Sequence, residues 1–168
     1  PYKNVRVCGA PPPSSWVAVG MTLGILENSY GFSDKGAEDP MNWALFAQAQ
    51  QLAYADRDQY VAHTRQVDVP LQGLLHHDYL AQRAALISKN SAMPSISAGD
   101  PWKYNTTTTT QVNGIDATQD VHGTTHFVIV DAQGDVVSMT AKVESIFGTT
   151  RMVGGMFLNN ELTDFSFR

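Results

Sequence analysis

Residues 88–123 carry no helical or strand periodicity, and they separate two halves of the sequence with different hydrophobic patterns. The segment is rich in Ser, Thr, Asn, Gly and Pro, a composition typical of irregular structure. Residues before it show helical spacing, whereas residues after it alternate as strands do. Helices followed by strands indicate an α+β fold, or part of a layered fold. Because irregular stretches of this length are uncommon inside compact domains, we expect this one to be mobile and functional.

The first half predicts a short strand followed by helices. Asp39 offers a side-chain acceptor at a helix N-cap, and Pro40 suits the first helical position. Ser14 or Ser15 is expected to cap the helix before it. Trp43 and later apolar residues fall at helical spacing and are expected in the core. The predicted elements are a strand at 5–8, an apolar helix at 17–26, a helix from 39 to about 60, and a helix from about 79 to 87.

The second half predicts an antiparallel hairpin formed by strands 125–131 and 136–143, with a further strand at 157–158. Pairing about Gln133 and Gly134 places Thr124 opposite residues 141–143. The strand period of two puts Ser138, Thr140, Lys142 and Glu144 on one polar face, and Val137, Met139, Ala141 and Val143 on the natural core face. His126 shares its face with Thr124, and we expect it to contribute to packing.

Composition excludes several classes of protein. The 168 residues suit one domain, and 11 Lys and Arg against 16 Asp and Glu give a net charge of -5. Without a basic block, nucleic acid is not an expected partner. No apolar run is long enough to span a bilayer. The single Cys8 excludes an intrachain disulfide and is expected to be inert. Because His76 and His77 lack partners at ligand spacing, no metal or cofactor is expected.

Gly123 directly precedes a threonine that opens a predicted strand. If the bond between them is cut, Thr124 would carry both a hydroxyl nucleophile and a free α-amine as its base. The reference pKa of such an amine is about 7.7–8.0, so part of it is neutral under working conditions. Glycine helps because it tolerates strained dihedrals and close approach. An edge hairpin with a solvated polar face fits the pattern equally well.

The sequence resembles the γ-glutamyltranspeptidase family of N-terminal nucleophile hydrolases along nearly its whole length. The resemblance implies a four-layer αββα fold, of which this chain supplies helices first and then antiparallel strands. One departure is Trp16, where the family usually has glycine. The motifs that carry the resemblance are Pro11 to Ser15, Ala53 to Arg57, Thr124 to Phe127, Val130-Asp131, Gly134, Thr140, Phe147-Gly148, Leu158 to Asn160, and Asp164 to Ser166.

The resemblance also implies roles for individual residues. Thr124 would be the nucleophile, released by autoproteolysis after Gly123, and Thr140 would belong to the catalytic group. The donors would be glutathione-like γ-glutamyl compounds, and the acceptor would be water or the amine of an amino acid or peptide. Asp164 would hold the α-amino group of the donor with the help of Glu161, a charge-assisted contact.

Two substitutions at substrate-binding positions separate this chain from the better-known members. Lys142 stands where many members have a hydroxyl residue, and it would depress the pKa of the Thr124 amine by like-charge repulsion or crowd the site. Glu144 stands where the transpeptidases have asparagine, and it would not favour the α-carboxylate of a γ-glutamyl donor. Some relatives are acylases of glutaryl-cephalosporin side chains, which lack the amino group. A glutaryl acylase is therefore one alternative, and a non-catalytic relative or fragment with an assembly or binding role is another.

By resemblance, residues 1–123 form the C-terminal part of a large subunit, in which 88–123 are a mobile segment before the cleavage point. Residues 124–168 would begin the small subunit. The family's donor-binding arginine lies upstream of this region, and its serine pair and Gly-Gly segment lie downstream. The expected partners are therefore the remaining segments of both subunits, without which this chain should be inactive. Members of the family are periplasmic or secreted, and this chain carries no signal-peptide pattern.

Overall fold

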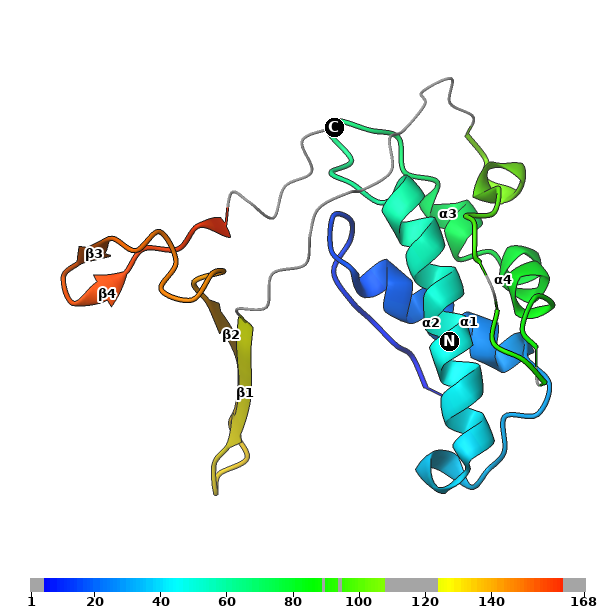
Figure 1. The fold of residues 1–168 in the computed structure, drawn as a ribbon, viewed down its shortest axis with the longest axis horizontal. Coiled ribbons are helices and arrows are strands. Elements are labelled where there is room, and N and C mark those ends of the chain that lie inside the picture. Colours follow the sequence, from blue (N-terminus) through cyan, green and yellow to red (C-terminus); the bar gives the residue numbers. More distant parts are fainter. Residues whose placement is uncertain (1–4, 89, 94, 108–123, 162–168) are drawn as a thin grey trace. The chain divides into compact units, whose positions relative to one another are not determined.

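The computed structural model describes residues 5–88, 90–93, 95–107 and 124–161. The chain forms two compact units, Pro1–Ile115 and Asp116–Arg168, called here the helical unit and the strand unit (Figure 1). Helices precede antiparallel strands, as predicted. The elements are α1 (Trp16–Asn28), η1 (Gly36–Glu38), α2 (Pro40–Tyr60), α3 (Leu71–Leu74), α4 (His77–Ala84), η2 (Pro101–Tyr104), β1 (Thr124–Val130), β2 (Val136–Lys142), β3 (Met152–Val153) and β4 (Met156–Phe157).

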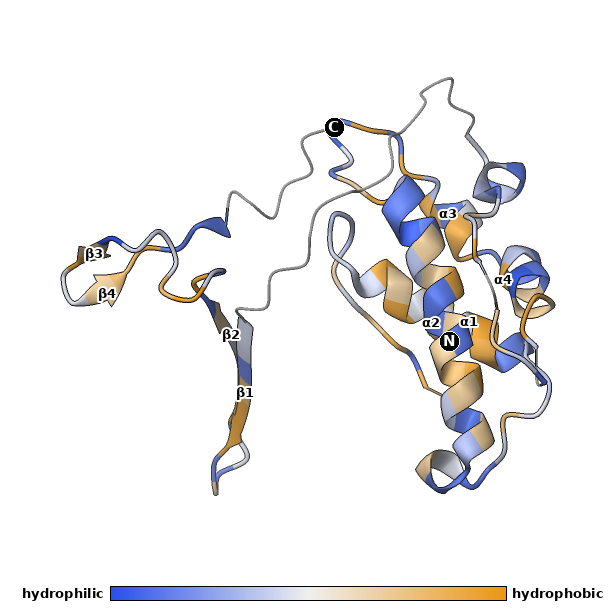
Figure 2. Cartoon of the chain, in the orientation of Figure 1, coloured by the Kyte–Doolittle hydropathy of each residue, from blue (hydrophilic) through white to orange (hydrophobic). Residues whose placement is uncertain are grey.

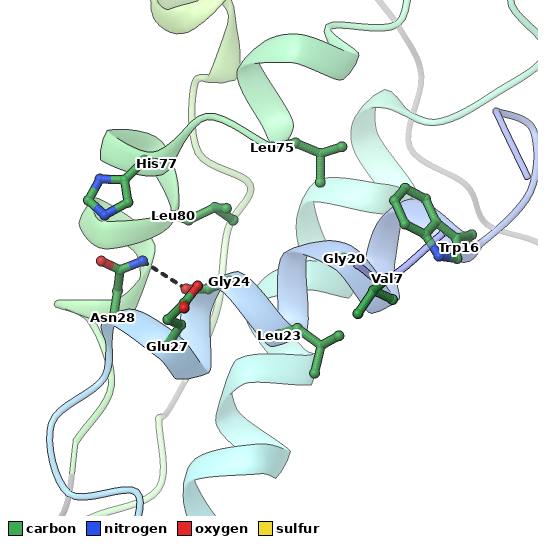
Figure 3. Close-up of a pocket in the computed structure, with 10 residues that line it drawn as sticks. All are labelled: Val7, Trp16, Gly20, Leu23, Gly24, Glu27, Asn28, Leu75, His77 and Leu80. Atoms are coloured by element: carbon green, nitrogen blue, oxygen red, sulfur yellow. Dashed lines mark hydrogen bonds between the residues drawn. The ribbon is translucent and has the colours of Figure 1, made fainter. Parts of the chain in front are cut away.

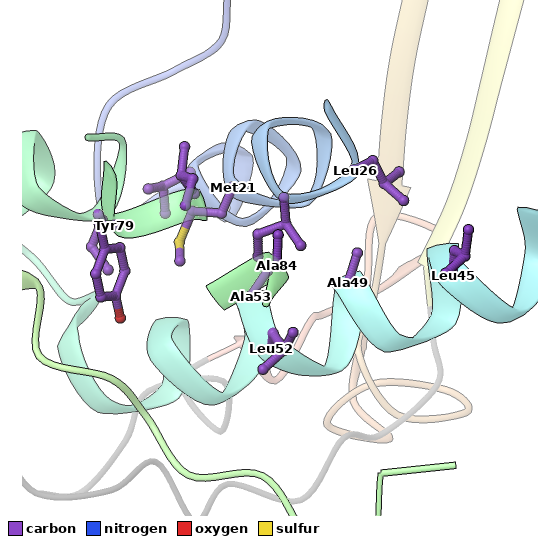
Figure 4. Close-up of a cluster of buried hydrophobic side chains, with 12 residues drawn as sticks. Met21, Leu26, Leu45, Ala49, Leu52, Ala53, Tyr79 and Ala84 are labelled. Atoms are coloured by element: carbon purple, nitrogen blue, oxygen red, sulfur yellow. The ribbon is translucent and has the colours of Figure 1, made fainter. Parts of the chain in front are cut away.

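The core of the helical unit lies where α1 meets α2 and α4 (Figure 4). Each fully buried aliphatic side chain there contributes about 1.5–3 kcal/mol relative to an exposed one. Across the described ranges, no helix has both the length and the apolar character that crossing a bilayer requires. The buried core residues are Val17, Met21, Ile25, Leu26, Leu45, Ala49, Leu52, Ala53, Leu74, Tyr79, Leu80 and Ala84.

The start of α2 follows the predicted chemistry. The Asp39 carboxylate accepts a hydrogen bond from the Met41 N–H at 2.9 Å, and Pro40 occupies the first helical position. The expected core position of Trp43 is wrong, because its side chain is 57% exposed. Its indole N–H instead donates to the Ala37 carbonyl at 2.9 Å, which ties α2 to η1.

Other expectations for the helical unit need correction. Residues 5–8 are not a strand, since only Val5 makes an isolated bridge. The short helix α3 was not predicted. The last helix, α4, begins at His77 rather than near Tyr79, because the His76 ring accepts a hydrogen bond from the Asp78 N–H at 3.2 Å and caps it.

The described part of the aperiodic segment is packed and not structureless. The Gln48 side-chain amide binds the Ser88 backbone twice: its Nε2 donates to the Ser88 carbonyl at 2.8 Å, and its Oε1 accepts from the Ser88 N–H at 3.0 Å. The Tyr60 hydroxyl donates to the Gly99 carbonyl at 2.7 Å, and η2 follows with Pro101 buried. Side chains of the helices therefore bind the backbone of this segment, a mode of packing that leaves no hydrophobic period. Residues 108–123, which complete the segment, lie outside the described residues.

A buried ion pair joins α2 to α4. Arg83 Nε lies 3.1 Å from Asp56 Oδ2, with side chains 5% and 0% exposed. The other oxygen of Asp56 accepts from the Gly99 N–H at 2.7 Å, and Arg83 donates to the Ser97 carbonyl at 3.0 Å. Burial raises the pKa of Asp56, and the guanidinium opposes that shift. The pair thus holds residues 97–99 against both helices.

The strand unit is built on the β1–β2 hairpin, whose antiparallel register pairs Thr124 with Lys142 and Val130 with Val136. This register confirms the pairing predicted from the turn. Strand β1 changes from hydrophilic at its start to hydrophobic towards its end (Figure 2). A second hairpin pairs β3 with β4, and only β4 was anticipated. Every residue of β1 and β2 is exposed, so the predicted core face with Val137 and Met139 is not covered by any residue that the structure describes.

Candidate active site

Thr124 is the first residue of β1, and it is exposed. Its direct cross-strand partner is Lys142, at the end of β2. Directly opposed residues in an antiparallel pair have Cβ atoms about 4.5–5.5 Å apart and share one face of the sheet. The hydroxyl-bearing residue and the lysine are therefore immediate neighbours. Gly123, the other half of the predicted cleavage bond, lies outside the described residues.

Next along the same face, His126 bridges two hydroxyl groups. Its Nδ1 lies 2.8 Å from Thr140 Oγ1, and its Nε2 lies 3.2 Å from Ser138 Oγ. A neutral imidazole offers one donor and one acceptor, and either hydroxyl can complement it. Thr140, predicted to be catalytic, therefore contacts His126 and is opposite it in the register. His126 is a polar bridge, whereas packing was expected.

Three charged side chains meet at Lys142, the cross-strand partner of Thr124. Lys142 Nζ lies 3.1 Å from Glu144 Oε2 and 3.3 Å from Glu161 Oε2. The Glu144 side chain is 3% exposed, whereas those of Lys142 and Glu161 are 31% and 33% exposed. We call this group the Lys142 cluster. All three residues were predicted as substrate-binding residues, and in the structure they form one ion-paired group.

The turn after β2 shapes this cluster. Glu144 has a φ of 72°, in the left-handed region that residues other than glycine rarely adopt. Asn160 holds the same turn, since its Oδ1 accepts from the Ser145 N–H at 3.0 Å and its Nδ2 donates to Ser145 Oγ at 3.0 Å. The backbone N–H of Asn160 also donates to the Val143 carbonyl at 3.3 Å. These hydrogen bonds hold residue 160 against the turn, so that the Glu161 side chain lies within ion-pair distance of Lys142.

Sequence reasoning missed two features of this region. The link between Ser145 and Asn160 joins residues far apart in the chain, and only the paired Asn159-Asn160 motif hinted at it. The His126–Ser138 contact could have been found from strand parity, because both residues lie on the polar face. Asp164, the predicted partner of Glu161, lies outside the described residues.

The helical unit contains a separate pocket of about 430 Å³ beside α1 (Figure 3). Trp16, Leu23, Leu75 and Leu80 give it a mainly apolar lining, and Glu27 lies at its edge. None of the residues predicted for catalysis or substrate binding lines it. Among the residues that the structure describes, no three His, Cys, Asp or Glu side chains form a group able to hold a metal ion.

Comparisons with known sequences point to one family. The family model described as Gamma-glutamyltranspeptidase matches residues 1–168. The glutathione hydrolase proenzymes of Bacillus subtilis (strain 168) and Bacillus subtilis subsp. natto are 39% and 37% identical to this chain over 98% of its length. The Acylase ACY 1 proenzyme of Pseudomonas sp. (strain SE83) is 33% identical over 98% of it. The chain spans 28%, 28% and 27% of these relatives.

Two solved structures are also similar to this chain. The gamma-glutamyltranspeptidase of Helicobacter pylori is 27% identical, with a TM-score of 0.55 over 59% of this chain and 29% of its own. A cephalosporin acylase from Bacillus halodurans superposes over 93% of this chain and 24% of its own with a TM-score of 0.65. At 19% identity, this second likeness concerns the fold alone.

Proposed function

Since this chain belongs to the gamma-glutamyltranspeptidase family, which is a family of enzymes, we propose that it supplies the nucleophile of a γ-glutamyl hydrolase or transferase. The reaction cleaves the γ-glutamyl amide bond of glutathione-like donors. The acyl group passes to water, or to the amine of an amino acid or peptide. One observation carries this proposal: Thr124 is the exposed first residue of a strand, and the Lys142 cluster lies beside it.

Maturation begins with cleavage of the Gly123–Thr124 bond by the chain itself. Thr124 Oγ attacks the Gly123 carbonyl carbon, and the Thr124 nitrogen leaves as an amine. Water then hydrolyses the ester and frees the hydroxyl. Before cleavage this nitrogen is an amide and cannot act as a base, so the precursor is inactive towards donors. The word proenzyme in the names of the relatives supports such a step.

After cleavage, the Thr124 α-amine is the general base for its own hydroxyl. Thr124 Oγ attacks the γ-carbonyl carbon of the donor, and the amine accepts the hydroxyl proton. The amine then passes this proton to the departing nitrogen, which leaves an acyl ester on Thr124. Water or an acceptor amine attacks that ester and restores the enzyme. We assign the hydrogen-bond donors that stabilise the oxyanion to the family's Gly-Gly segment, which lies downstream of this region.

The remaining site residues have binding and positioning roles in this proposal. Asp164 and Glu161 hold the α-ammonium group of the donor through charge-assisted hydrogen bonds. Thr140 acts through His126, whose ring it contacts at 2.8 Å. Glu144 and Lys142 border the same subsite, because both belong to the Lys142 cluster.

The subunit organisation follows from the cleavage point. Residues 1–123 would form the end of the large subunit, with 88–123 before the cut, and residues 124–168 would begin the small subunit. The mature enzyme would adopt the four-layer αββα architecture, completed by the other segments of both subunits. We place it in the periplasm or outside the cell, by analogy with the family.

A glutaryl acylase is the second candidate, and the Lys142 cluster favours it. Lys142 already pairs with Glu161, one of the two carboxylates proposed to hold a donor ammonium, and also with Glu144. A glutaryl group lacks that ammonium and needs neither carboxylate. The 33% identity to the Acylase ACY 1 proenzyme supports this reading as well. A non-catalytic role in assembly or binding is the third candidate.

Turnover of paired donors separates these candidates. The full-length protein is incubated with γ-glutamyl-p-nitroanilide and with glutaryl-p-nitroanilide, each with and without a dipeptide acceptor. A γ-glutamyl enzyme releases nitroaniline mainly from the first, and an acylase mainly from the second. The Thr124→Ala variant should release it from neither. A full-length protein that turns over no donor and stays uncut would leave only the non-catalytic reading.

A further inference from the structure

We infer that Lys142 sets the donor selectivity of the proposed site, because its ammonium group competes with that of a γ-glutamyl donor for Glu161, while Glu144 holds Lys142 in place. This inference rests on the proposed function, since it concerns the acyl group delivered to Thr124. In this inference, Lys142 shifts the preference of the site away from donors with an α-ammonium group and towards glutaryl-type donors without one.

The position of Lys142 is the first support. It is the cross-strand partner of Thr124, so its side chain leaves the same face of the hairpin as the nucleophile. An acyl group on Thr124 Oγ therefore starts at the strand position and on the face that Lys142 shares. We take the far end of a five-carbon acyl chain to lie at the Lys142 cluster.

The charges of the cluster are the second support. The ammonium of Lys142 lies 3.1 Å from one carboxylate and 3.3 Å from the other, and neither distance leaves room for a second cation between them. Glu144 is nearly fully buried, and among the residues that the structure describes the Lys142 ammonium is the ion-pair partner of its Oε2. Burying an uncompensated carboxylate is costly, so Glu144 retains the nearby ammonium in the resting site.

The chemistry of the two donor classes supplies the third step. γ-Glutamyl and glutaryl groups share one carbon chain and a terminal carboxylate, and they differ in the α-ammonium group. A donor ammonium that approaches Glu161 meets the like charge of Lys142 and must displace it from that carboxylate. A glutaryl group pays no such penalty. Replacing Lys142 with a neutral residue changes the net charge of the cluster from one negative charge to two, which favours the ammonium donor.

Binding of two matched ligands tests this without turnover. L-Glutamate and glutarate differ only in the α-ammonium group, and their affinities for the full-length protein are measured by isothermal titration calorimetry. We expect Lys142→Gln to raise the ratio of glutamate affinity to glutarate affinity by about tenfold, as one gained charge contact would. Glutamine keeps a donor for Glu144, which protects the fold.

Two controls accompany this measurement. Lys142→Arg keeps the charge and should leave the ratio within about twofold of the wild type. Lys103→Gln removes an exposed lysine that pairs with Asp100 in the helical unit, and it should not change the ratio. An unchanged ratio in Lys142→Gln would overturn the inference, as would an equal rise in Lys103→Gln. Failure of donor turnover would count against the proposed function alone, since the affinities do not depend on it.

Discussion

Thr124 and Lys142 are directly opposed in the β1–β2 hairpin, and the Lys142 ammonium lies 3.1 Å from the buried carboxylate of Glu144. The Thr124 hydroxyl group and the Lys142 side chain thus lie on the same face of the hairpin, at the end where β1 begins and β2 ends. This arrangement accounts for both halves of the proposal. In the proposed function, the position of Thr124 would serve its release as a nucleophile, and the charges of the Lys142 cluster would select the acyl group.

Two substitutions of Thr124 should isolate the contribution of its hydroxyl group to cleavage and turnover. Thr124→Ser keeps the nucleophile, so we expect cleavage and turnover at a reduced rate. Thr124→Ala removes it, so the chain should stay uncut and kcat/KM should fall by at least about 10³-fold. Gel electrophoresis and anilide assays measure both effects. Normal cleavage in Thr124→Ala would show that another group cuts the chain.

Thr140 should affect catalysis through its contact with the His126 ring. Thr140→Val removes the hydroxyl that lies 2.8 Å from His126, so we expect kcat to fall about tenfold with little change in KM. Thr140→Ser keeps the contact and should retain most of the activity. Equal kcat values for the valine variant and the wild type would exclude a positioning role for Thr140.

Removing one partner of the ion pair between Asp56 and Arg83 should destabilise the fold more than removing both partners. Arg83→Met leaves a buried carboxylate without its counter-charge, which should cost about 3–5 kcal/mol. The double variant Asp56→Leu with Arg83→Met should recover much of that loss. Urea unfolding followed by circular dichroism measures these differences.

The neighbouring pair of Arg57 and Asp58 is the matched control, because its side chains are 29% and 38% exposed. Asp58→Ala should cost no more than about 1 kcal/mol. If Arg83→Met were as mild as this control, the buried pair would not hold the helical unit together.

The cap of α2 should weaken in acid. Hydrogen bonds from Ser33 and from the Met41 N–H hold the pKa of Asp39 below its ordinary value of 3.8. The unfolded chain therefore binds this proton more readily than the folded chain does. The contribution of Asp39 to stability is complete above the unfolded pKa, and it is lost as the pH falls through the folded pKa.

Asp39→Asn keeps a cap acceptor but does not titrate, so it isolates this effect. Between pH 5 and pH 2, the melting temperature of the wild type should fall more steeply than that of the variant. Parallel curves over this range would rule out a role for the Asp39 charge.

Local chemistry in the sequence was enough to predict several elements. The Asp39-Pro40 pair marked the start of α2, and the turn about Gln133 and Gly134 predicted that Thr124 lies opposite residues 141–143, which include its observed partner Lys142. Each depends on residues close together in the chain. Backbone preference and strand period act over such short separations, so a pattern can reveal them.

Contacts between distant residues could not be predicted in this way. The irregular segment owes its packing to Gln48, Tyr60 and Asp56, which bind its backbone and leave no periodic trace. The Lys142 cluster depends on Glu161, carried into place by the link between Ser145 and Asn160. The strand period predicted a polar face that includes Lys142 and Glu144, whereas the ion pair of Lys142 with Glu161 depends on the folding of the chain after β2.

The N-terminal sequence of the small fragment in purified, active full-length protein tests the central claim most directly. Our account predicts two fragments by intact mass, with Edman cycles of the smaller one reading Thr, Thr, His and Phe from residue 124 onwards. A protein that turns over donors as a single uncut chain, or with a fragment that begins at any other residue, would contradict it.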